Sequence, residues 1–157
     1  MDFELLGYAD RVGQLFQRWG MPQAVGRIFG YLLVCEPPEQ TAAQISQGLG
    51  ISLGTVSNAL RLLTEFGMAE KFTVPGQRSR LVRISPRPVL GMLRAELSGI
   101  TALRELCGQG LELLSAKGRK PSSGLAALVG DLEFVEEEYR LLMDRFLSRR
   151  RDEGGQE

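Results

Sequence analysis

The chain has 157 residues, 43% of them hydrophobic and 24% charged, and its 19 basic and 19 acidic side chains give a net charge of zero. A chain of this length can bury roughly 68–70% of its unfolded surface, so we expect one domain, or a small domain with extensions. There is no histidine, which removes the commonest general base and the commonest metal ligand. GxSxG, P-loop and strand-linked GxGxxG motifs are also missing, so we expect no enzyme, no catalytic residue, no metal and no cofactor. An enzyme built only on Asp, Glu, Lys or Tyr is the alternative, and no motif favours it.

No apolar run approaches the roughly 20 residues of a membrane span, and the start MDFELLGYADR lacks the pattern of a signal peptide. We therefore expect a cytoplasmic protein without a membrane partner. The two cysteines, Cys35 and Cys107, lie among apolar residues and form no CxxC pair. They are typical of reduced core thiols, and a redox pair or sensor is the alternative.

Apolar residues at spacings of three and four predict a helix from Leu5 to Trp19, and a second helix is expected over about 23–35. Thr41 and Gln44 form a capping box at the start of a short helix. A glycine turn follows, and Ser52 then caps the next helix. The runs 68–74 and 81–84 predict two strands joined by a polar, basic turn.

Two long helical patterns come next, with apolar seams over 90–114 and 125–146. Three such seams carry more apolar length than one small domain can cover, so we predict a homodimer. An intrachain three-helix bundle is the alternative. Arg104 interrupts the first long seam, and either pairs with an acid among 133–138 or lies at the rim. The predicted dimer interface consists of Leu5, Tyr8, Val12, Leu128, Leu132, Val135, Tyr139 and Leu142.

The helix over 52–65 has two different faces. Its expected inward arc is Leu53, Val56, Ala59, Leu60 and Leu63. Its outward arc is Gly54, Thr55, Asn58, Arg61, Leu62 and Glu65. Small polar side chains at a helix N-terminus suit the DNA major groove, where Asn pairs with adenine and Arg with guanine or phosphate. The residues predicted to contact DNA are Ser52, Thr55, Ser57, Asn58, Arg61, Gln77, Arg78 and Arg80.

Charge supports this interpretation, because residues 51–88 hold six basic and two acidic side chains. Two alternatives stay open. One is a capped surface helix followed by an ordinary exposed turn. The other is a winged helix that binds another protein, which is favoured only by Leu62 and Glu65 on the outward arc; DNA contact is expected to end near Arg61.

The stretch AAQISQGLGISLGTVSNALRLLTEFGMAEKF, followed by VPGQRSRLVRIS, resembles the winged helix-turn-helix of the MarR family of bacterial regulators. The run GMPQAVGRIFGYLLVCEPPEQTAAQI resembles the GbsR-like branch of that family. The resemblance implies a mainly α fold with a small two- or three-stranded β-wing. Its parts would be an N-terminal dimerisation helix (1–20), the winged helix-turn-helix (21–88), C-terminal dimerisation helices (89–150) and a disordered tail (151–157).

The resemblance further implies a homodimer on pseudo-palindromic double-stranded DNA, and we expect a repressor. It implies a recognition helix that carries Thr55, Ser57, Asn58 and Arg61, with Arg78 as the wing arginine. Gly76 stands where such wings often carry an Asp, so the internal charge pairing of the wing is in question. A small-molecule effector would be a further partner, with choline or a related quaternary ammonium as one candidate. Such a cation needs an aromatic cage. The nearby aromatics, which are more typical of core packing, are Tyr8, Phe16, Trp19, Phe29 and Tyr31.

Overall fold

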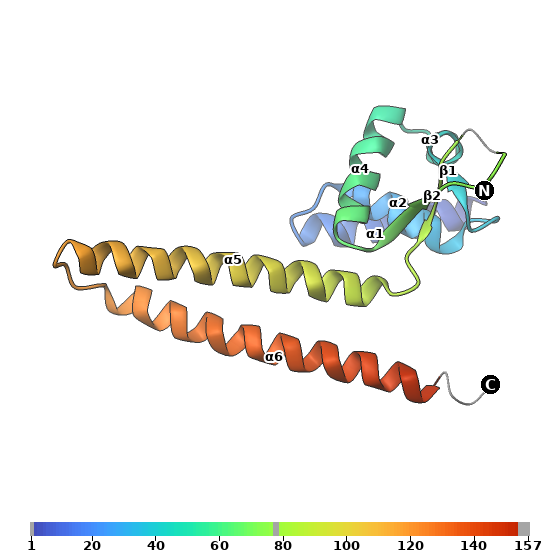
Figure 1. The fold of residues 1–157 in the computed structure, drawn as a ribbon. Helices are drawn as coiled ribbons and strands as arrows, with labels where there is room; N and C mark the ends of the chain where they lie inside the picture. Colours follow the sequence, from blue (N-terminus) through green and yellow to red (C-terminus); the bar gives the residue numbers. More distant parts are fainter. Residues whose placement is uncertain (1, 77–78, 154–157) are drawn as a thin grey trace. The chain divides into compact units, whose positions relative to one another are not determined.

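The computed structural model describes residues 2–76 and 79–153, and the chain divides into two compact units, residues 1–92 and 93–157 (Figure 1). The described elements are α1 (Phe3–Arg18), α2 (Gln23–Val34), β1 (Gln40–Thr41), α3 (Ala42–Leu49), α4 (Leu53–Glu65), β2 (Ala69–Phe72), β3 (Leu81–Ile84), α5 (Pro88–Ala116) and α6 (Ser123–Glu153). This order, with a three-stranded antiparallel sheet β1-β3-β2, is a winged helix-turn-helix followed by long helices. The expected fold class is confirmed.

Helices α1 and α2 pack closely because glycines remove the side chains between them. A Cβ atom on Gly26 would lie 2.6 Å from Phe16 Cβ, and one on Gly30 would lie 3.0 Å from Ala9 Cα. An ion pair between Arg27 Nε and Asp10 Oδ1, at 2.5 Å, ties the same two helices together. The Gly20–Leu32 run that carried the resemblance to the GbsR-like branch therefore has a packing role.

The helix-turn-helix begins and turns as the sequence predicts. Thr41 Oγ1 accepts a hydrogen bond from the Gln44 backbone N–H at 3.2 Å, and Gln44 Oε1 accepts one from the Thr41 N–H at 2.7 Å, which completes the capping box. Helix α3 extends to Leu49. Gly50 then ends it in the left-handed conformation, with φ of 64°, which glycine adopts without strain.

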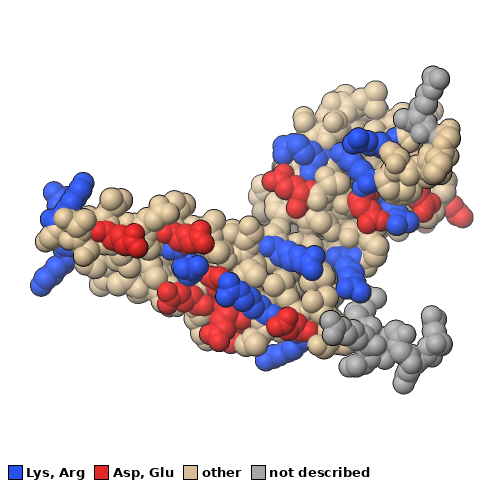
Figure 2. All heavy atoms as spheres, viewed as in Figure 1, with Lys and Arg blue, Asp and Glu red and all other residues tan. Residues whose placement is uncertain are grey.

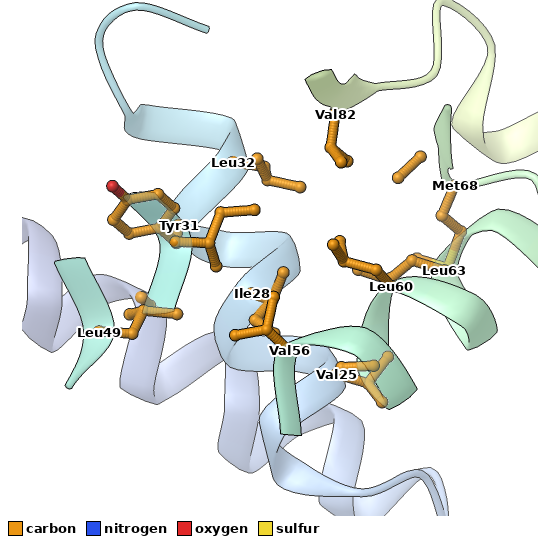
Figure 3. Packing of buried hydrophobic residues seen from close by; sticks show 14 of the residues in the cluster. Val25, Ile28, Tyr31, Leu32, Leu49, Val56, Leu60, Leu63, Met68 and Val82 are labelled. Atoms are coloured by element: carbon orange, nitrogen blue, oxygen red, sulfur yellow. The ribbon is translucent and has the colours of Figure 1, made fainter. Parts of the chain in front are cut away.

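The core of the first unit lies where α2, α4 and the sheet meet (Figure 3). The side chains labelled there, all buried, are Val25, Ile28, Tyr31, Leu32, Leu49, Val56, Leu60, Leu63, Met68 and Val82. Each large aliphatic side chain buried in this way contributes about 1.5–3 kcal/mol. Because α4 is anchored by one face, its opposite face is presented to solvent.

Two leucines of α4 differ from expectation. Leu53 was expected on the inward arc, but 56% of its surface is exposed. It is the first residue of the helix and lies at the edge of the arc, so the core centred on Val56 and Leu60 does not reach it. Leu62 was expected to face outward, but it packs against the core cluster on the side of α2.

The second unit consists of α5 from Leu93 onward and the antiparallel helix α6 (Figure 1). Arg104 Nε donates a hydrogen bond to Glu136 Oε2 at 2.6 Å, and Arg140 also binds the Glu136 carboxylate. The predicted pairing of Arg104 with an acid of 133–138 is thus present. Glu136, only 4% exposed, is the one buried residue among residues 93–149. Helix α6 continues to Glu153, into the segment expected to be a tail, and residues 154–157 lie outside the described part.

Candidate nucleic-acid interface

The N-terminus of α4 is held by a cap of two hydroxyl groups. Ser52 Oγ accepts a hydrogen bond from the Thr55 backbone N–H at 3.1 Å, and the hydroxyls of Ser52 and Thr55 are hydrogen-bonded to each other at 2.8 Å. The first turn of the helix is therefore fixed, and its remaining N–H groups and dipole favour a phosphate group nearby. Both residues are predicted to contact DNA; in the structure Ser52 caps the helix and the Thr55 hydroxyl is hydrogen-bonded to that cap.

The outward face of α4 is short and uncharged over its first turns. Ser57 and Asn58 are exposed. Within the described part of the chain, no side-chain hydrogen bond engages either of them. At Gly54 the nearest atom to an added Cβ would be Ser52 Oγ at 3.8 Å, so this position is open. Short polar side chains without intramolecular partners permit close approach to base edges.

Arg61 lies one turn further along α4 and is already paired. Its Nη1 is 3.2 Å from Glu65 Oε2, and both side chains are mostly exposed. An exposed pair at this i,i+4 spacing contributes only about 0.3–0.5 kcal/mol. Arg61 can therefore exchange Glu65 for a phosphate oxygen at little cost. Glu65, which did not suit a DNA face, is accounted for by this pair.

The wing is stabilised by an arginine that the sequence analysis did not single out. Arg83 Nε lies 2.6 Å from Glu70 Oε1, and Arg83 Nη1 lies 3.7 Å from Glu39 Oε1. The same guanidinium lies over the Phe72 ring, 4.8 Å from its centroid. The glycine at position 76 had put the internal charge pairing of the wing in question. That pairing is supplied instead by Arg83 of β3 and Glu70 of β2. The pairing of Glu70 with Arg83 across the sheet could have been found from strand register alone.

The tip of the wing is described only in part. The backbone at Gly76 has φ of 86°, a conformation that suits glycine. The predicted contact residues Gln77 and Arg78 lie outside the described residues. Arg80, the third, is exposed directly before β3.

The basic excess of residues 51–88 is smaller in the structure than in the sequence. Arg61 and Arg83 are neutralised by partners, whereas Lys71, Arg80 and Arg87 have no ion pair within the described ranges. Figure 2 shows basic and acidic side chains interspersed on the visible face of each unit, with much uncharged surface between them. Electrostatic attraction to DNA would therefore come from a few isolated cations and the N-terminus of α4.

A hollow of about 270 Å³ separates α4 from the first turn of α2. Its lining is Pro22, Ala24, Val25, Thr55, Asn58, Ala59 and Leu62. Thr55 and Asn58 thus belong both to the candidate DNA face and to the rim of this hollow. The fold brings the start of α2 next to the predicted contact residues. The sequence analysis missed this proximity because the two segments are some 30 residues apart.

Metal binding, membrane spanning and thiol chemistry were the other features considered from the sequence. The described residues contain no group of three or more Cys, Asp or Glu side chains placed to hold a metal ion. They also contain no helix with the length and apolar character needed to span a membrane. Cys35 and Cys107 are free thiols, and burial raises the pKa of Cys35. A raised pKa disfavours the thiolate that a redox sensor needs.

The aromatic residues considered for a cation cage serve mainly in packing. Phe16 and Tyr31 are buried in the core, and Phe29 packs against it. The Phe16 ring contacts those of Trp19 and Phe29 at centroid distances of 5.4 and 5.5 Å. These rings therefore pack on one another and leave Trp19 as the most exposed of the three.

The predicted dimer residues are incompletely covered within one chain. Leu5, Leu128 and Leu142 are exposed. The others are half-buried, and they are Tyr8, Val12, Leu132, Val135 and Tyr139. In α1 the intrachain contact uses a neighbouring face, formed by Ala9, Gly13 and Phe16. Val12 of the predicted seam also contacts α2, since a Cβ atom on Gly30 would lie 3.0 Å from Val12 Cβ.

The chain is similar to known transcriptional regulators in both sequence and structure. No protein-family model matches the chain. The chain is 25% identical over 146 residues to the HTH-type transcriptional regulator MmpR5 of Mycobacterium tuberculosis, which is 93% of this chain and 88% of that protein. It is 27% identical over 77 residues to the putative HTH-type transcriptional regulator YvaV of Bacillus subtilis, covering 49% of this chain and 43% of that protein.

Among solved structures, a crystal structure of a transcriptional regulator superposes with a TM-score of 0.84 at 25% identity. The match covers 92% of this chain and 99% of that chain. The similarity includes both the winged helix and the long helices. Over nearly its whole length the chain is thus similar in sequence to a helix-turn-helix transcriptional regulator and in fold to a solved transcriptional regulator.

Proposed function

We propose that this chain is a sequence-specific, DNA-binding transcriptional regulator that acts as a homodimer in the cytoplasm and has no enzymatic activity. The observation that carries the proposal is the exposed, unengaged face of α4 at Gly54, Ser57 and Asn58, on a helix whose other face is fixed in the core. The similarity to helix-turn-helix transcriptional regulators supports it.

On DNA, α4 would lie in the major groove with its N-terminal half toward the bases. Asn58 would pair with adenine through its amide, and Arg61 would leave Glu65 for guanine or a phosphate. The capped N-terminus at Ser52 and Thr55 would approach a backbone phosphate. The wing, with Arg80 and also Gln77 and Arg78, would follow the backbone or enter the minor groove.

The homodimer is supported by apolar side chains that one chain leaves exposed on its helices. On α5 and α6 these are Leu103, Leu106, Leu113, Leu128, Phe134, Leu141 and Leu142. So many exposed apolar side chains on two adjacent helices favour a symmetric partner. A two-fold dimer would place its recognition helices on half-sites about 10 bp apart, or a multiple of that distance.

We further propose that binding represses transcription by covering a promoter, and that the chain belongs to the GbsR-like branch. The branch rests on the Gly20–Leu32 run, whose glycines pack α1 on α2. A small-molecule effector would act by changing the spacing of the two recognition helices, and no described feature selects its chemistry.

A winged helix that binds another protein is not favoured by the structure. Its support came from Leu62 and Glu65 on the outward arc. Leu62 packs against the core and Glu65 pairs with Arg61. Leu62, the apolar part of that support, is therefore engaged within the fold.

The test is a titration of labelled DNA from the region upstream of the coding gene, followed by fluorescence anisotropy at several salt concentrations. We expect one fragment to bind far more tightly than unrelated DNA of equal length, with affinity that falls as salt rises. Equal affinity for all fragments, or none for any, would contradict the proposal.

A further inference from the structure

Leu53 is the exception among the apolar residues of α4. It follows the capping residue Ser52 and is the first residue of the helix. More than half of its surface is exposed, whereas Val56, Leu60 and Leu63 are almost fully buried. An exposed leucine is common on protein surfaces. This one, however, lies at the end of α4 that the proposed function directs toward the bases.

The polar groups next to Leu53 are partly committed to the fold. The Ser52 and Thr55 hydroxyls are hydrogen-bonded to each other and cap the helix. Gly54 offers no side chain. Ser57, one turn after Leu53 and on the same side of the helix, carries only a hydroxymethyl group. The largest surface that the first turn of α4 presents is therefore the isobutyl group of Leu53.

The major groove contains one apolar group on its base edges, the C5 methyl of thymine. An exposed leucine at the tip of a recognition helix would cover polar base atoms at a cost, because buried polar groups need hydrogen-bond partners. Against a thymine methyl it would instead bury apolar surface of both partners. The chemistry of Leu53 thus favours one of the bases.

We propose that Leu53 determines specificity by contacting a thymine C5 methyl in each half-site. The proposal rests on the proposed function and adds a base preference to it. Asn58 would supply an adenine contact elsewhere in the same half-site. Together the two residues would select half-sites rich in A·T pairs.

The hollow on the other side of α4 is consistent with this arrangement. Ala59 and Leu62 line it together with Pro22 and Ala24 of α2. The polar surface at Asn58 therefore lies between two apolar surfaces, the side chain of Leu53 and the apolar lining of the hollow. Thymine and adenine together present a methyl group beside hydrogen-bonding groups in the major groove, and this pattern matches a polar surface with apolar edges.

The experiment uses a duplex selected from a random library by the full-length protein. Each thymine of one half-site is replaced in turn by deoxyuridine, which removes only the C5 methyl. We expect one position at which the wild-type protein binds about fourfold more weakly, the factor that corresponds to burial of one methyl-sized group. Leu53→Ala should bind the thymine and deoxyuridine duplexes equally, and Leu53→Met should retain the difference.

Leu33→Ala serves as the control, because Leu33 is 46% exposed and lies at the end of α2. It should keep the fourfold difference. Three results would overturn the role of Leu53 while leaving specific DNA binding intact. Deoxyuridine could have no effect at any position, or the selected half-site could contain no thymine. Leu53→Ala could also keep the full difference in affinity between the thymine and deoxyuridine duplexes. If no duplex is selected over random DNA, the proposed function itself fails.

Discussion

We predict that base recognition by α4 depends chiefly on the side chain of Asn58. It is exposed, it lies on the face opposite the core, and it is free of side-chain hydrogen bonds within the described part of the chain. Replacing it by alanine should cost about 1–3 kcal/mol of binding to the preferred site and should relax the preference at one base pair. Competition assays against single-base variants of the site measure this. An unchanged ranking of those variants would remove Asn58 from the interface.

Arg80 should behave differently, because it lies at the wing and carries charge without a described ion-pair partner. Arg80→Ala should weaken binding to specific and random DNA by a similar factor. The slope of log affinity against log salt should become shallower by about one, as expected for one lost phosphate contact. Glu65→Gln is the contrasting variant: it releases Arg61 from its ion pair and should not reduce affinity. A loss confined to the specific site would show that Arg80 reads sequence.

At the scale of elements, the junction of α1 and α2 is the most constrained part of the first unit. In Gly26→Ala the new methyl would meet Phe16 Cβ at 2.6 Å and the Val12 carbonyl oxygen at 2.7 Å, so one helix must move. We expect a loss of about 1–3 kcal/mol in the free energy of unfolding, the usual cost of overpacking. Urea titration followed by circular dichroism measures it.

Gly7→Ala is the matched control on α1. There the nearest atom to an added Cβ is Arg11 Nη1 at 3.7 Å, an ordinary contact. Alanine is also the better helix former, so this variant should gain about 0.5–1 kcal/mol. Equal effects of the two substitutions would mean that the close approach of α1 and α2 does not limit stability.

The α5–α6 pair contains a buried carboxylate whose charge matters for its stability. The hydrogen bond from Arg104 lowers the pKa of Glu136, with burial opposing and Thr101 and Arg140 assisting. The folded pKa therefore lies below the unfolded value of about 4.3. The resulting stabilisation is complete above that unfolded value and is lost as the pH falls through the lowered folded pKa.

Thermal unfolding of Glu136→Gln should test this. At pH 7 the variant should melt below the wild type, and the difference should shrink on acidification below the ordinary glutamate pKa. Glu105→Gln removes an exposed carboxylate 4.0 Å from the same Arg104 guanidinium, and it should change the melting temperature little. If the difference in melting temperature between Glu136→Gln and the wild type did not change with pH, the effect would come from the shape of the side chain rather than from its charge.

Local signals in the sequence were sufficient for most of these elements. The capping box of Thr41 and Gln44 and the cap at Ser52 act over three residues, and the structure has both. The pairing of Arg104 could be narrowed to a short acidic run because few acids face an interrupted apolar seam. Periodicity alone misplaced Leu53 and Leu62, because the burial of an arc residue depends on which neighbouring helix covers it. Long-range neighbours such as Pro22 beside Asn58, or Arg83 between Glu39 and Glu70, needed the fold.

At the scale of the whole molecule, the proposed dimer depends on leucines that a single chain leaves exposed. The full-length protein should sediment at micromolar concentration with about twice the 17.3 kDa mass of the chain. Leu142→Glu places a charge on α6 within the predicted interface and should shift the equilibrium to monomer, because an interface core tolerates no unpaired charge. Leu33→Glu is the matched control, since Leu33 and Leu142 are both 46% exposed, and it should remain dimeric.

The same pair of variants links assembly to DNA binding. A monomer contacts one half-site, so Leu142→Glu should lose most of its affinity for a two-half-site duplex while binding an isolated half-site as the wild type does. Leu33→Glu should match the wild type on both. If Leu142→Glu sediments as a dimer, the two-fold contact does not use this part of α6. A wild-type protein that sediments at 17 kDa would contradict the dimer itself.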